Sequence, residues 1–457
     1  KHNHLTVGLD IGTTKICAIA VESDSKETLN VVGVGTAKSE GLRKGVVVNI
    51  EKTVKSIKKA VEECELMCGE QINSVYAGIA GHHIKGQNSR GMVTVYHNRT
   101  VTEEDIRRVI DAAQVLIPND REVLHILPSE FIVDDQDGVQ NPLGMAAARL
   151  EVNVHIVTGS VTSAQNIIKC CNQAGLDVED IVLEPLASSQ AVLSPDEQEV
   201  GVVLVDIGGG TTDITIYSEG SIVHTAVLAL GGNHLTHDIA IGLGTPLQEA
   251  EEIKHSDGIA LSDMTDENEM IGVPSVGGRN NRQMKKMVLA GIIEDRFREI
   301  FELIGREIEK THYHKLMASG VVITGGSCIM PAVGCRRRRR RLAEAAVQAV
   351  RPLLGEDLLV ALLPAEGETK EGVISPNGEV VSHHRIEFLP ALSWAACNGR
   401  WSWTCGTCEA HWKCFPVLPG HPQGIVEVSL HQSGQVGQGY RNFTCDICMV
   451  AWRAVHA

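Results

Sequence analysis

Two short loops of similar composition, far apart in the sequence, constrain this chain more than any other feature. Residues 9–15 read LDIGTTK and residues 205–213 read VDIGGGTTD, and each loop follows a hydrophobic strand and opens with Asp. A turn of Gly and Thr lets backbone N–H groups and hydroxyls surround a phosphate, while the leading carboxylate can hold a hydrated divalent cation. One such loop is typical of an ordinary strand turn. Their repetition predicts a nucleotide held between two halves of the chain.

The size and charge of the chain limit its class. Its 457 residues exceed what one core usually spans, so we expect several subdomains. A formal net charge of −16 argues against a nucleic-acid partner, because affinity for a phosphate backbone is largely electrostatic. No apolar run reaches the about 20 residues of a membrane span, and the N-terminal residues do not resemble a signal peptide. The 13 cysteines, an odd number, fit reduced thiols, so we expect a cytoplasmic protein.

The pattern of apolar residues predicts mixed α/β architecture. Alternation predicts a strand over residues 5–9, a returning strand over 16–20 and another strand over 320–324. Helical spacing predicts a helix from residue 50 to 67, and a second helix begins at Thr102, ahead of an acidic first turn.

The segment over residues 182–191 carries a candidate catalytic residue. It reads VLEPLASSQA, in which Glu184 precedes Pro185 and small residues follow. Small side chains let a helix pass close to its neighbour, so the segment predicts a crossover at a hinge between the two halves. Glu184 then faces the cleft, where a carboxylate positions the water that attacks a γ-phosphate. The alternative is a solvent-facing carboxylate stabilised by a helix dipole.

Three further segments are candidates for nucleotide contact. Residues 231–233 (GGN) precede a helix whose free N–H groups can approach a nucleotide. Glu251 and Lys254 lie three residues apart on one predicted helical face, and Gly325-Gly326 follow a predicted strand, where a flat base can lie against backbone. Turn chemistry and an exposed helical ion pair remain the alternatives.

Taken together, the loops, the Glu184-Pro185 connector and Gly325-Gly326 resemble the actin, Hsp70 and hexokinase ATPase superfamily. Within it the chain resembles the FtsA family of bacterial cell-division proteins, over about residues 5–331. This narrower resemblance rests on four segments: residues 78–84 (GIAGHHI), 99–106 (RTVTEEDI), 120–125 (DREVLH) and 149–152 (RLEV). It implies an α/β, actin-like (ribonuclease H-like) two-lobed ATPase fold with an inserted FtsA-type subdomain.

The resemblance also implies subdomain boundaries. Subdomain 1C, the insertion, would mediate self-assembly and contacts with other division proteins. The implied ranges are 1–84 for subdomain 1A, 85–160 for 1C, 161–228 with 310–334 for 2A, 229–309 for 2B and 335–457 for an atypical tail.

ATP with Mg²⁺ is the ligand that the resemblance implies. Asp10 and Asp206 would lie near the metal, the two loops would contact phosphates, and the later segments would contact ribose and adenine. Turnover in the family is generally weak, so we expect ATP to be an assembly ligand first and at most a slowly hydrolysed substrate. The implied nucleotide contacts, besides the two aspartates, are Gly12, Thr13, Thr14, Lys15, Gly208, Gly209, Gly210, Thr211, Thr212, Gly231, Gly232, Asn233, Glu251, Lys254, Gly325, Gly326, Ser327 and Met330.

The implied partners are further copies of the chain, assembled into protofilaments, and the acidic C-terminal tail of the tubulin-like protein FtsZ. The FtsZ surface would lie over residues 277–310, where Arg279, Arg282, Lys285 and Lys286 precede or begin a long helix. A solvated charged face is the alternative. The predicted buried face of that helix consists of Ile293, Phe297, Ile300, Phe301, Ile304 and Ile308.

After Pro331 the sequence departs from the family. Six arginines occupy residues 336–341, and the terminal amphipathic helix that anchors the family to the inner membrane is not recognisable. A frameshift, a fusion, an artificial ending and a genuine domain remain open. Residues 336–354 are the one substitute anchor we identify, against the alternative of a solvated basic arm. Zinc binding by Cys405, Cys408, Cys445 and Cys448 competes with unpaired cysteines, because the pairs lie further apart than the usual ~15–20 residues.

The function expected from these observations is ATP-dependent assembly and recruitment of FtsZ to the septum, at the cytoplasmic face of the inner membrane. An active ATPase or sugar kinase of the same superfamily is one alternative, although no Asp base in a substrate pocket is evident. An Hsp70-like chaperone is another, although the tail does not resemble a peptide-binding β-domain.

Overall fold

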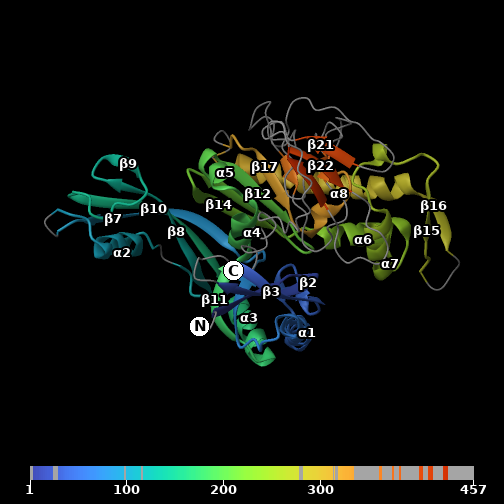
Figure 1. Ribbon diagram of the computed structural model, residues 1–457, viewed down its shortest axis with the longest axis horizontal. Helices are drawn as coiled ribbons and strands as arrows, with labels where there is room; N and C mark the ends of the chain where they lie inside the picture. Colours follow the sequence, from blue (N-terminus) through green and yellow to red (C-terminus); the bar gives the residue numbers. More distant parts are fainter. Residues whose placement is uncertain are drawn as a thin grey trace.

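The computed structural model describes residues 4–23, 29–96, 99–114, 117–276, 281–311, 313 and 317–333, together with short strands beyond residue 359. This part of the chain forms two lobes and an inserted subdomain that projects to one side of them (Figure 1). None of its helices combines the length and the apolar character needed to cross a membrane.

Lobe one is built on a five-stranded sheet with the order β11-β6-β1-β2-β3. Strands β1 and β2 pair antiparallel, so the first glycine-threonine loop, residues 9–15 (loop one), forms the turn between them. Strand β6 runs parallel to β1. The predicted strands over 5–9 and 16–20 are confirmed within β1 and β2. The elements are β1 (His4–Ile11), β2 (Lys15–Ser23), β3 (Leu29–Lys38), β6 (Ser74–Ile79), β11 (Asp177–Leu183), α1 (Ile50–Cys68) and α3 (Val161–Ala174).

Helix α1 confirms the predicted helix over 50–67. The Asn49 side chain accepts a hydrogen bond from the Lys52 N–H, and Gly69 ends the helix with a φ of 75°. The face of α1 that carries Ile57, Ala60 and Cys64 is buried against the lobe-one sheet.

The insert consists of a four-stranded sheet with the order β7-β10-β8-β9, covered by one helix. Thr102 caps that helix, its hydroxyl accepting from the Asp105 N–H, which confirms the predicted start. The elements are β7 (Lys85–Thr94), β8 (Arg121–Val133), β9 (Gln136–Val139), β10 (Arg149–Ser160) and α2 (Glu103–Ala112).

Lobe two repeats the topology of lobe one, because its sheet has the order β14-β13-β12-β17-β18. Strands β12 and β13 form the hairpin that carries the second glycine-threonine loop, residues 205–213 (loop two). Strand β17 runs parallel to β12. Strand β17 confirms the predicted strand over 320–324. The sheet elements are β12 (Val202–Ile207), β13 (Thr212–Ser218), β14 (Ser221–Leu228), β17 (Val321–Thr324) and β18 (Val360–Leu362).

Helices cover the lobe-two sheet and form its outer part. The long helix α8 buries all six residues of its predicted apolar face, and Arg296 on it binds Asp238 on α6 at 2.5 Å. The elements are α4 (Glu184–Val192), α5 (Pro195–Val200), α6 (Gly232–Leu243), α7 (Leu247–Asp257), α8 (Lys286–Glu309), β15 (Met270–Val273), β16 (Arg282–Lys285) and the 3₁₀ turns η1 (Ser262–Met264) and η3 (Gly326–Ile329).

Further strands follow β18 in the sequence. The Arg run 336–341 and the predicted zinc cysteines Cys405, Cys408, Cys445 and Cys448 lie outside the described residues, so the zinc and anchor hypotheses stay predictions. The strands are β19 (Val373–Ile374), β20 (Val380–Val381), β21 (Trp401–Thr404), β22 (Ala410–Cys414) and β23 (Val426–Leu430).

The insert makes polar contacts with both lobes. His125 Nε2 on β8 accepts a hydrogen bond from the Leu183 N–H, directly ahead of α4. On the side of lobe two, the His155 ring on β10 lies 2.9 Å from the Thr225 hydroxyl of β14, and Asn88 donates to the Val223 carbonyl. The insert therefore spans the two lobes.

Acid should weaken this packing. Burial, and then the neighbouring charge of His224, lowers the pKa of His155 to about 4 from a usual value of 6.5. Between these two values the unfolded chain binds a proton that the folded chain excludes. The free energy of unfolding should therefore fall as the pH falls through this window, by at most about 1.4 kcal/mol per pH unit. Denaturant titrations at pH 7.5 and 5 should show a smaller loss for His155→Gln than for the parent, and equal losses would contradict the assignment.

Candidate functional site

The two phosphate-type loops lie in contact across the two lobes. A Cβ added to Gly210 would lie 2.6 Å from Thr13 Oγ1, and one added to Gly209 would lie 2.4 Å from Thr14 Cγ2. Only glycine fits such an approach without displacing the opposite loop. The structure thus brings together the two loops that the sequence predicted to face one another.

Four carboxyl groups gather where the loops leave their strands. Asp206 and Asp213 are directly paired across the β12–β13 hairpin, and both of them, together with Asp10, lie close enough to Glu184 for their charges to raise its pKa. The Ser188 hydroxyl donates to Asp206 Oδ2 at 3.0 Å, and the Thr211 hydroxyl donates to Asp213 Oδ2 at 3.1 Å.

These carboxyl groups resist simultaneous ionisation. Burial, followed by the charges of Asp10, Asp213 and Asp206, raises the pKa of Glu184 well above its usual value. Burial and the charge of Asp206 raise the pKa of Asp213 to about 8. Asp213 Oδ1 is also buried, and no group in the described part of the chain donates a hydrogen bond to it. A bound cation would relieve both the repulsion and this unmet hydrogen-bonding capacity.

The donor set fits Mg²⁺ only in combination with phosphate. Within the described ranges, no group of three or more His, Cys, Asp or Glu side chains is arranged to hold a metal ion. Mg²⁺ usually keeps several waters and binds one or two carboxylates together with substrate phosphates. Asp10 and Asp206 suit that partial role.

Asp213 is absent from the residues predicted from the sequence. The available signal was its position at the end of the second loop motif, opposite Asp206 in an antiparallel hairpin. A strand pairing places such residues side by side, but the pairing register is a property of the fold.

Glu184 occupies the first turn of α4, where it is half-buried beside the other carboxyl groups. A Cβ added to Gly78 would lie 3.1 Å from Cγ of Glu184, so β6 passes directly beside the Glu184 side chain. The structure therefore places Glu184 toward the loops and not in the solvent-facing position of the alternative.

The start of α6 differs from the sequence-based expectation. The N–H groups of Gly232 and Asn233 were predicted to be free for a nucleotide, but they donate to the carbonyls of Gly208 and Gly209 at 2.9 and 2.8 Å. This prediction is wrong for those two groups, because the close approach of Gly231 to loop two lets the helix bind the loop backbone. The residues therefore shape loop two.

Glu251 and Lys254 share one face of α7, as predicted. Lys254 Nζ donates to both oxygens of Glu251, at 2.7 and 2.8 Å, and Thr236 on α6 also donates to Glu251. Although burial opposes the effect, these hydrogen bonds hold the pKa of Glu251 below its usual value. Thr236 is a second residue of the site that the sequence did not single out.

The segment after β17 closes the same region. The Ser327 hydroxyl donates to the Gly208 carbonyl at 3.1 Å, and Gly325, with a φ of 93°, would place a Cβ 2.3 Å from Asp206 Oδ1. A Cβ on Gly326 would meet no atom within 4 Å, so space is open there. Met330 lies near Gly258, at the end of α7. The predicted ribose and adenine segments therefore converge beside loop two.

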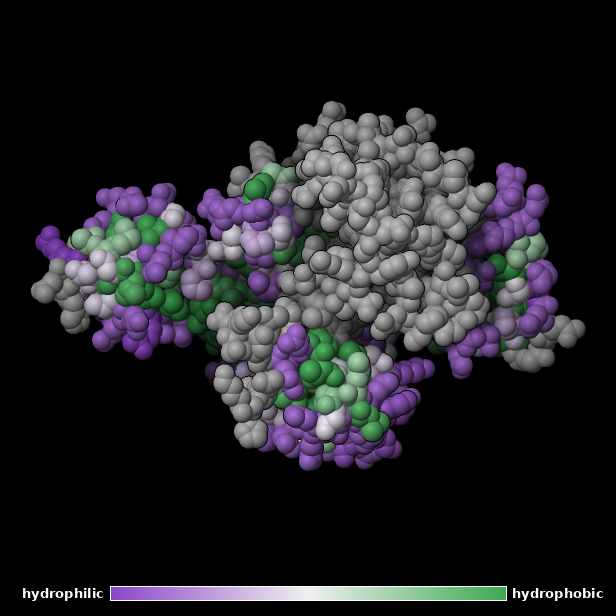
Figure 2. Space-filling view, in the orientation of Figure 1, coloured by the Kyte–Doolittle hydropathy of each residue, from purple (hydrophilic) through white to green (hydrophobic). Residues whose placement is uncertain are grey.

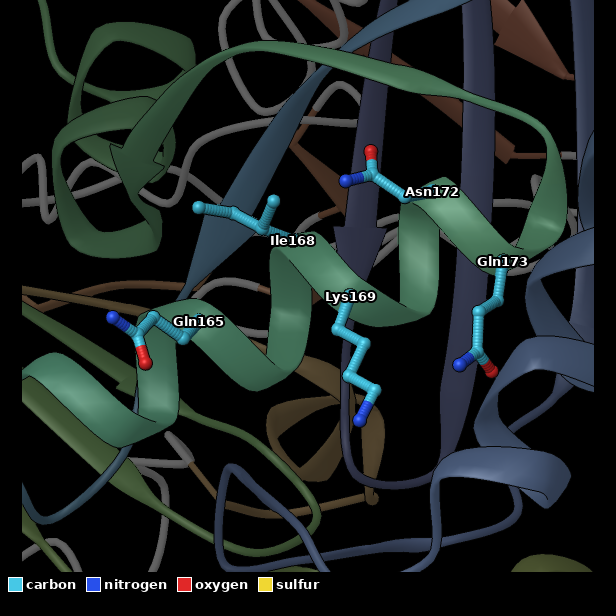
Figure 3. A pocket seen from close by; sticks show the side chains of 5 residues that line it. All are labelled: Gln165, Ile168, Lys169, Asn172 and Gln173. Carbon is cyan, nitrogen blue, oxygen red and sulfur yellow. The ribbon is translucent and has the colours of Figure 1, made fainter.

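A separate pocket of about 340 Å³ lies along the outer face of α3 (Figure 3). It is lined by Gln165, Ile168, Lys169, Asn172 and Gln173. None of the predicted site residues lines this pocket, so it is distinct from the site between the loops.

Two protein families match successive parts of this chain. The family described as "SHS2 domain inserted in FTSA" matches residues 81–158, and "Cell division protein FtsA" matches residues 203–377. The chain is 50% identical over 327 residues to the cell division protein FtsA of Pseudomonas aeruginosa, covering 71% of this chain and 78% of that protein. It is 40% identical over 343 residues to FtsA of Escherichia coli strain K12, covering 73% and 81%.

Among solved structures, the PilM-PilN type IV pilus biogenesis complex contains a similar chain. The TM-score is 0.53 at 15% identity, covering 79% of this chain and 88% of that one. An identity this low shows a shared fold and says nothing of shared activity. The two lobes have the actin-like fold, and the FtsA-type insert lies in the chain between β6 and α3 of lobe one. On its identity to relatives over most of their length, the chain belongs to the FtsA family of cell-division proteins.

Proposed function

We propose that this protein binds ATP with Mg²⁺ between its lobes, assembles into actin-like protofilaments and recruits FtsZ to the division septum at the inner membrane. The observation that carries the proposal is the contact between the two glycine-threonine loops beside four carboxyl groups. Family membership supports the division role, the self-association and the contacts of subdomain 1C with other division proteins.

Different residues of the site suit the phosphates, the ribose and the metal ion of a bound nucleotide. Backbone N–H groups of the two loops and the hydroxyls of Thr13 and Thr14 suit phosphate oxygens, and Glu251 with Lys254 suits a ribose. Mg²⁺, when bound, would supply positive charge that offsets the carboxylates of Asp10 and Asp206 beside the phosphates.

Glu184 is the proposed residue for water positioning in a slow hydrolysis. A carboxyl group accepts a proton from water only in its ionised form, and burial, followed by the neighbouring carboxylates, disfavours that form by raising the pKa of Glu184. Glu184 therefore acts as a proton acceptor only when a bound cation favours its ionised form, which fits ATP as an assembly ligand first and a substrate second.

Replacing Glu184 by Gln tests this role. We expect hydrolysis to fall by about a hundredfold or more, because the proton acceptor is lost. Binding of Mg²⁺-ATP should not weaken, because the amide keeps the shape of the side chain and removes one negative charge. Phosphate release and calorimetry measure the two effects, with the exposed Glu179→Gln as the matched control. Hydrolysis at the parental rate would exclude Glu184, and a parent without Mg²⁺-dependent ATP binding would overturn the proposed function.

The proposed FtsZ surface includes β16 and the start of α8. Arg282 and Lys285 are exposed on β16, whereas Lys286 is bound to Glu269 at 2.8 Å. Arg282 also donates to the carbonyls of Leu243 and Gly244 at the end of α6, so part of its role is structural. Arg279 lies outside the described residues.

Apolar side chains accompany these cations. Ile241 on α6 and Val288 on α8 are 72% and 45% exposed. At the β15–β16 end of the molecule, Figure 2 shows hydrophilic side chains around a few hydrophobic ones. A surface with both properties suits a tail peptide that carries acidic and apolar residues.

A charge reversal tests that surface. Lys285→Glu should weaken binding of an FtsZ tail peptide about fivefold, and the affinity of the parent should fall as salt increases. Fluorescence anisotropy with a labelled peptide measures both effects. Lys59→Glu, exposed on α1 in the other lobe, is the control. Salt-independent binding that Lys285→Glu leaves unchanged would place the contact elsewhere.

A further inference from the structure

A small hairpin that follows β3 reaches the contact between the loops. Strands β4 (Leu42–Arg43) and β5 (Val46–Val47) are joined by a two-residue turn, Lys44-Gly45, whose φ angles are 53° and 74°. Two consecutive left-handed residues define the turn that suits a right-twisted hairpin, and Asn-Gly is its favoured sequence. Lysine at the first position raises the conformational energy of the backbone, because in the left-handed conformation its Cβ lies too close to the following carbonyl oxygen.

The tip of this hairpin contacts both loops. The Gly45 N–H donates to the Thr13 hydroxyl of loop one at 3.1 Å. A Cβ added to Gly210 of loop two would lie 3.0 Å from Lys44 Cα. Gly81 packs against the other side of the turn, where a Cβ on Gly45 would lie 2.7 Å from its Cα. Lys44 is therefore fixed where lobe one meets lobe two, beside the residues proposed to hold phosphate.

The charge of Lys44 is felt at the start of α6 in lobe two. A nucleoside triphosphate held by the two loops would bring negative charge close to the Lys44 backbone, which lies beside Gly210. The Lys44 side chain is half-buried, and its charge contributes, after burial, to the lowered pKa of His234 at the start of α6. The positive charge therefore acts across the lobe boundary.

We propose that Lys44 is a phosphate-binding residue, whose ammonium group contacts the terminal phosphates of a nucleoside triphosphate where the two lobes meet. The inference rests on the proposed nucleotide function and adds a residue to it. It explains why an unfavourable residue occupies a left-handed position at the site, since a strained backbone persists where the surrounding structure and function require it.

Lys44→Asn separates this role from a structural one. Asn suits the turn better than Lys, so the thermal stability of the nucleotide-free variant should equal or exceed that of the parent. Its affinity for Mg²⁺-ATP should nevertheless fall by about tenfold or more, as expected for one charge-assisted hydrogen bond. The loss for Mg²⁺-ADP should be smaller. Lys44→Arg should restore most of the ATP affinity, and Arg43→Gln, which removes the adjacent exposed cation, should leave it unchanged.

Calorimetry on the full chain distinguishes the outcomes. If the parent binds ATP and Lys44→Asn binds it as tightly as Arg43→Gln does, the inference about Lys44 is wrong and the proposed function stands. A parent that does not bind ATP would overturn both. An equal loss for ATP and ADP would exclude a contact with the terminal phosphate. Should the Asn variant not fold, Lys44→Gln tests the same charge.

Discussion

Replacing Asp206 by Asn should strongly weaken Mg²⁺-dependent ATP binding and at the same time stabilise the nucleotide-free protein. Burial raises the pKa of Asp206, and its charge in turn raises the pKa of Asp213, so ionised Asp206 is unfavourable in the empty site. The amide removes that charge and can still accept the hydrogen bond from Ser188. Thermal unfolding without nucleotide should therefore shift to higher temperature.

The same substitution removes a negative ligand for the hydrated cation. We expect calorimetry to show about a hundredfold loss of affinity for Mg²⁺-ATP, with a much smaller loss when Mg²⁺ is omitted. Asp177→Asn, an exposed change at the start of β11, is the control and should change neither quantity. Unchanged Mg²⁺-ATP affinity in Asp206→Asn would remove the metal role of this residue.

The second large effect concerns the core of lobe one. Gly35→Ala should destabilise the protein by about 3 kcal/mol, because overpacking a tight core forces the backbone apart. The added Cβ would lie 1.9 Å from the Ala60 carbonyl oxygen and 2.4 Å from the Cys64 nitrogen, both of which are backbone atoms of α1. Neither atom can move without shifting the helix.

Gly291→Ala is the matched control for this prediction. Gly291 lies within α8, and a Cβ there would meet no atom within 4 Å. Alanine is the better helix former, so this variant should gain about 0.5–1 kcal/mol. Denaturant unfolding of both variants measures the difference. A Gly35→Ala variant as stable as the parent would show that β3 and α1 are packed less closely than described.

The features that the sequence predicted correctly are those with a local pattern. The strand-loop-strand units around Asp10 and Asp206 have apolar strands beside Gly and Thr, and the buried face of α8 repeats at helical spacing. Glu251 and Lys254 needed only the geometry of one helix. In each case the residues that decide the structure lie within a few positions of one another.

The remaining features depend on contacts between distant segments. Asp213 acquires its environment from strand pairing, and Lys44 reaches the site because a hairpin tip packs between two loops. The N–H groups of Gly232 and Asn233 were misassigned for the same reason, since their acceptors belong to loop two. No periodicity within one segment encodes such tertiary contacts.

The two attachments of the insert carry a geometric consequence. His125 is joined to lobe one just before α4, and His155 is joined to lobe two on the strand next to β13. If the insert is rigid, its hydrogen bonds to both lobes can persist only while the two lobes keep the same relative position. If the lobes rotate against each other, the insert, which lies in the chain between β6 and α3, must move with lobe one and give up its hydrogen bonds to lobe two. A small rotation of the lobes about the nucleotide would then move α2, far out on the insert, through a larger distance.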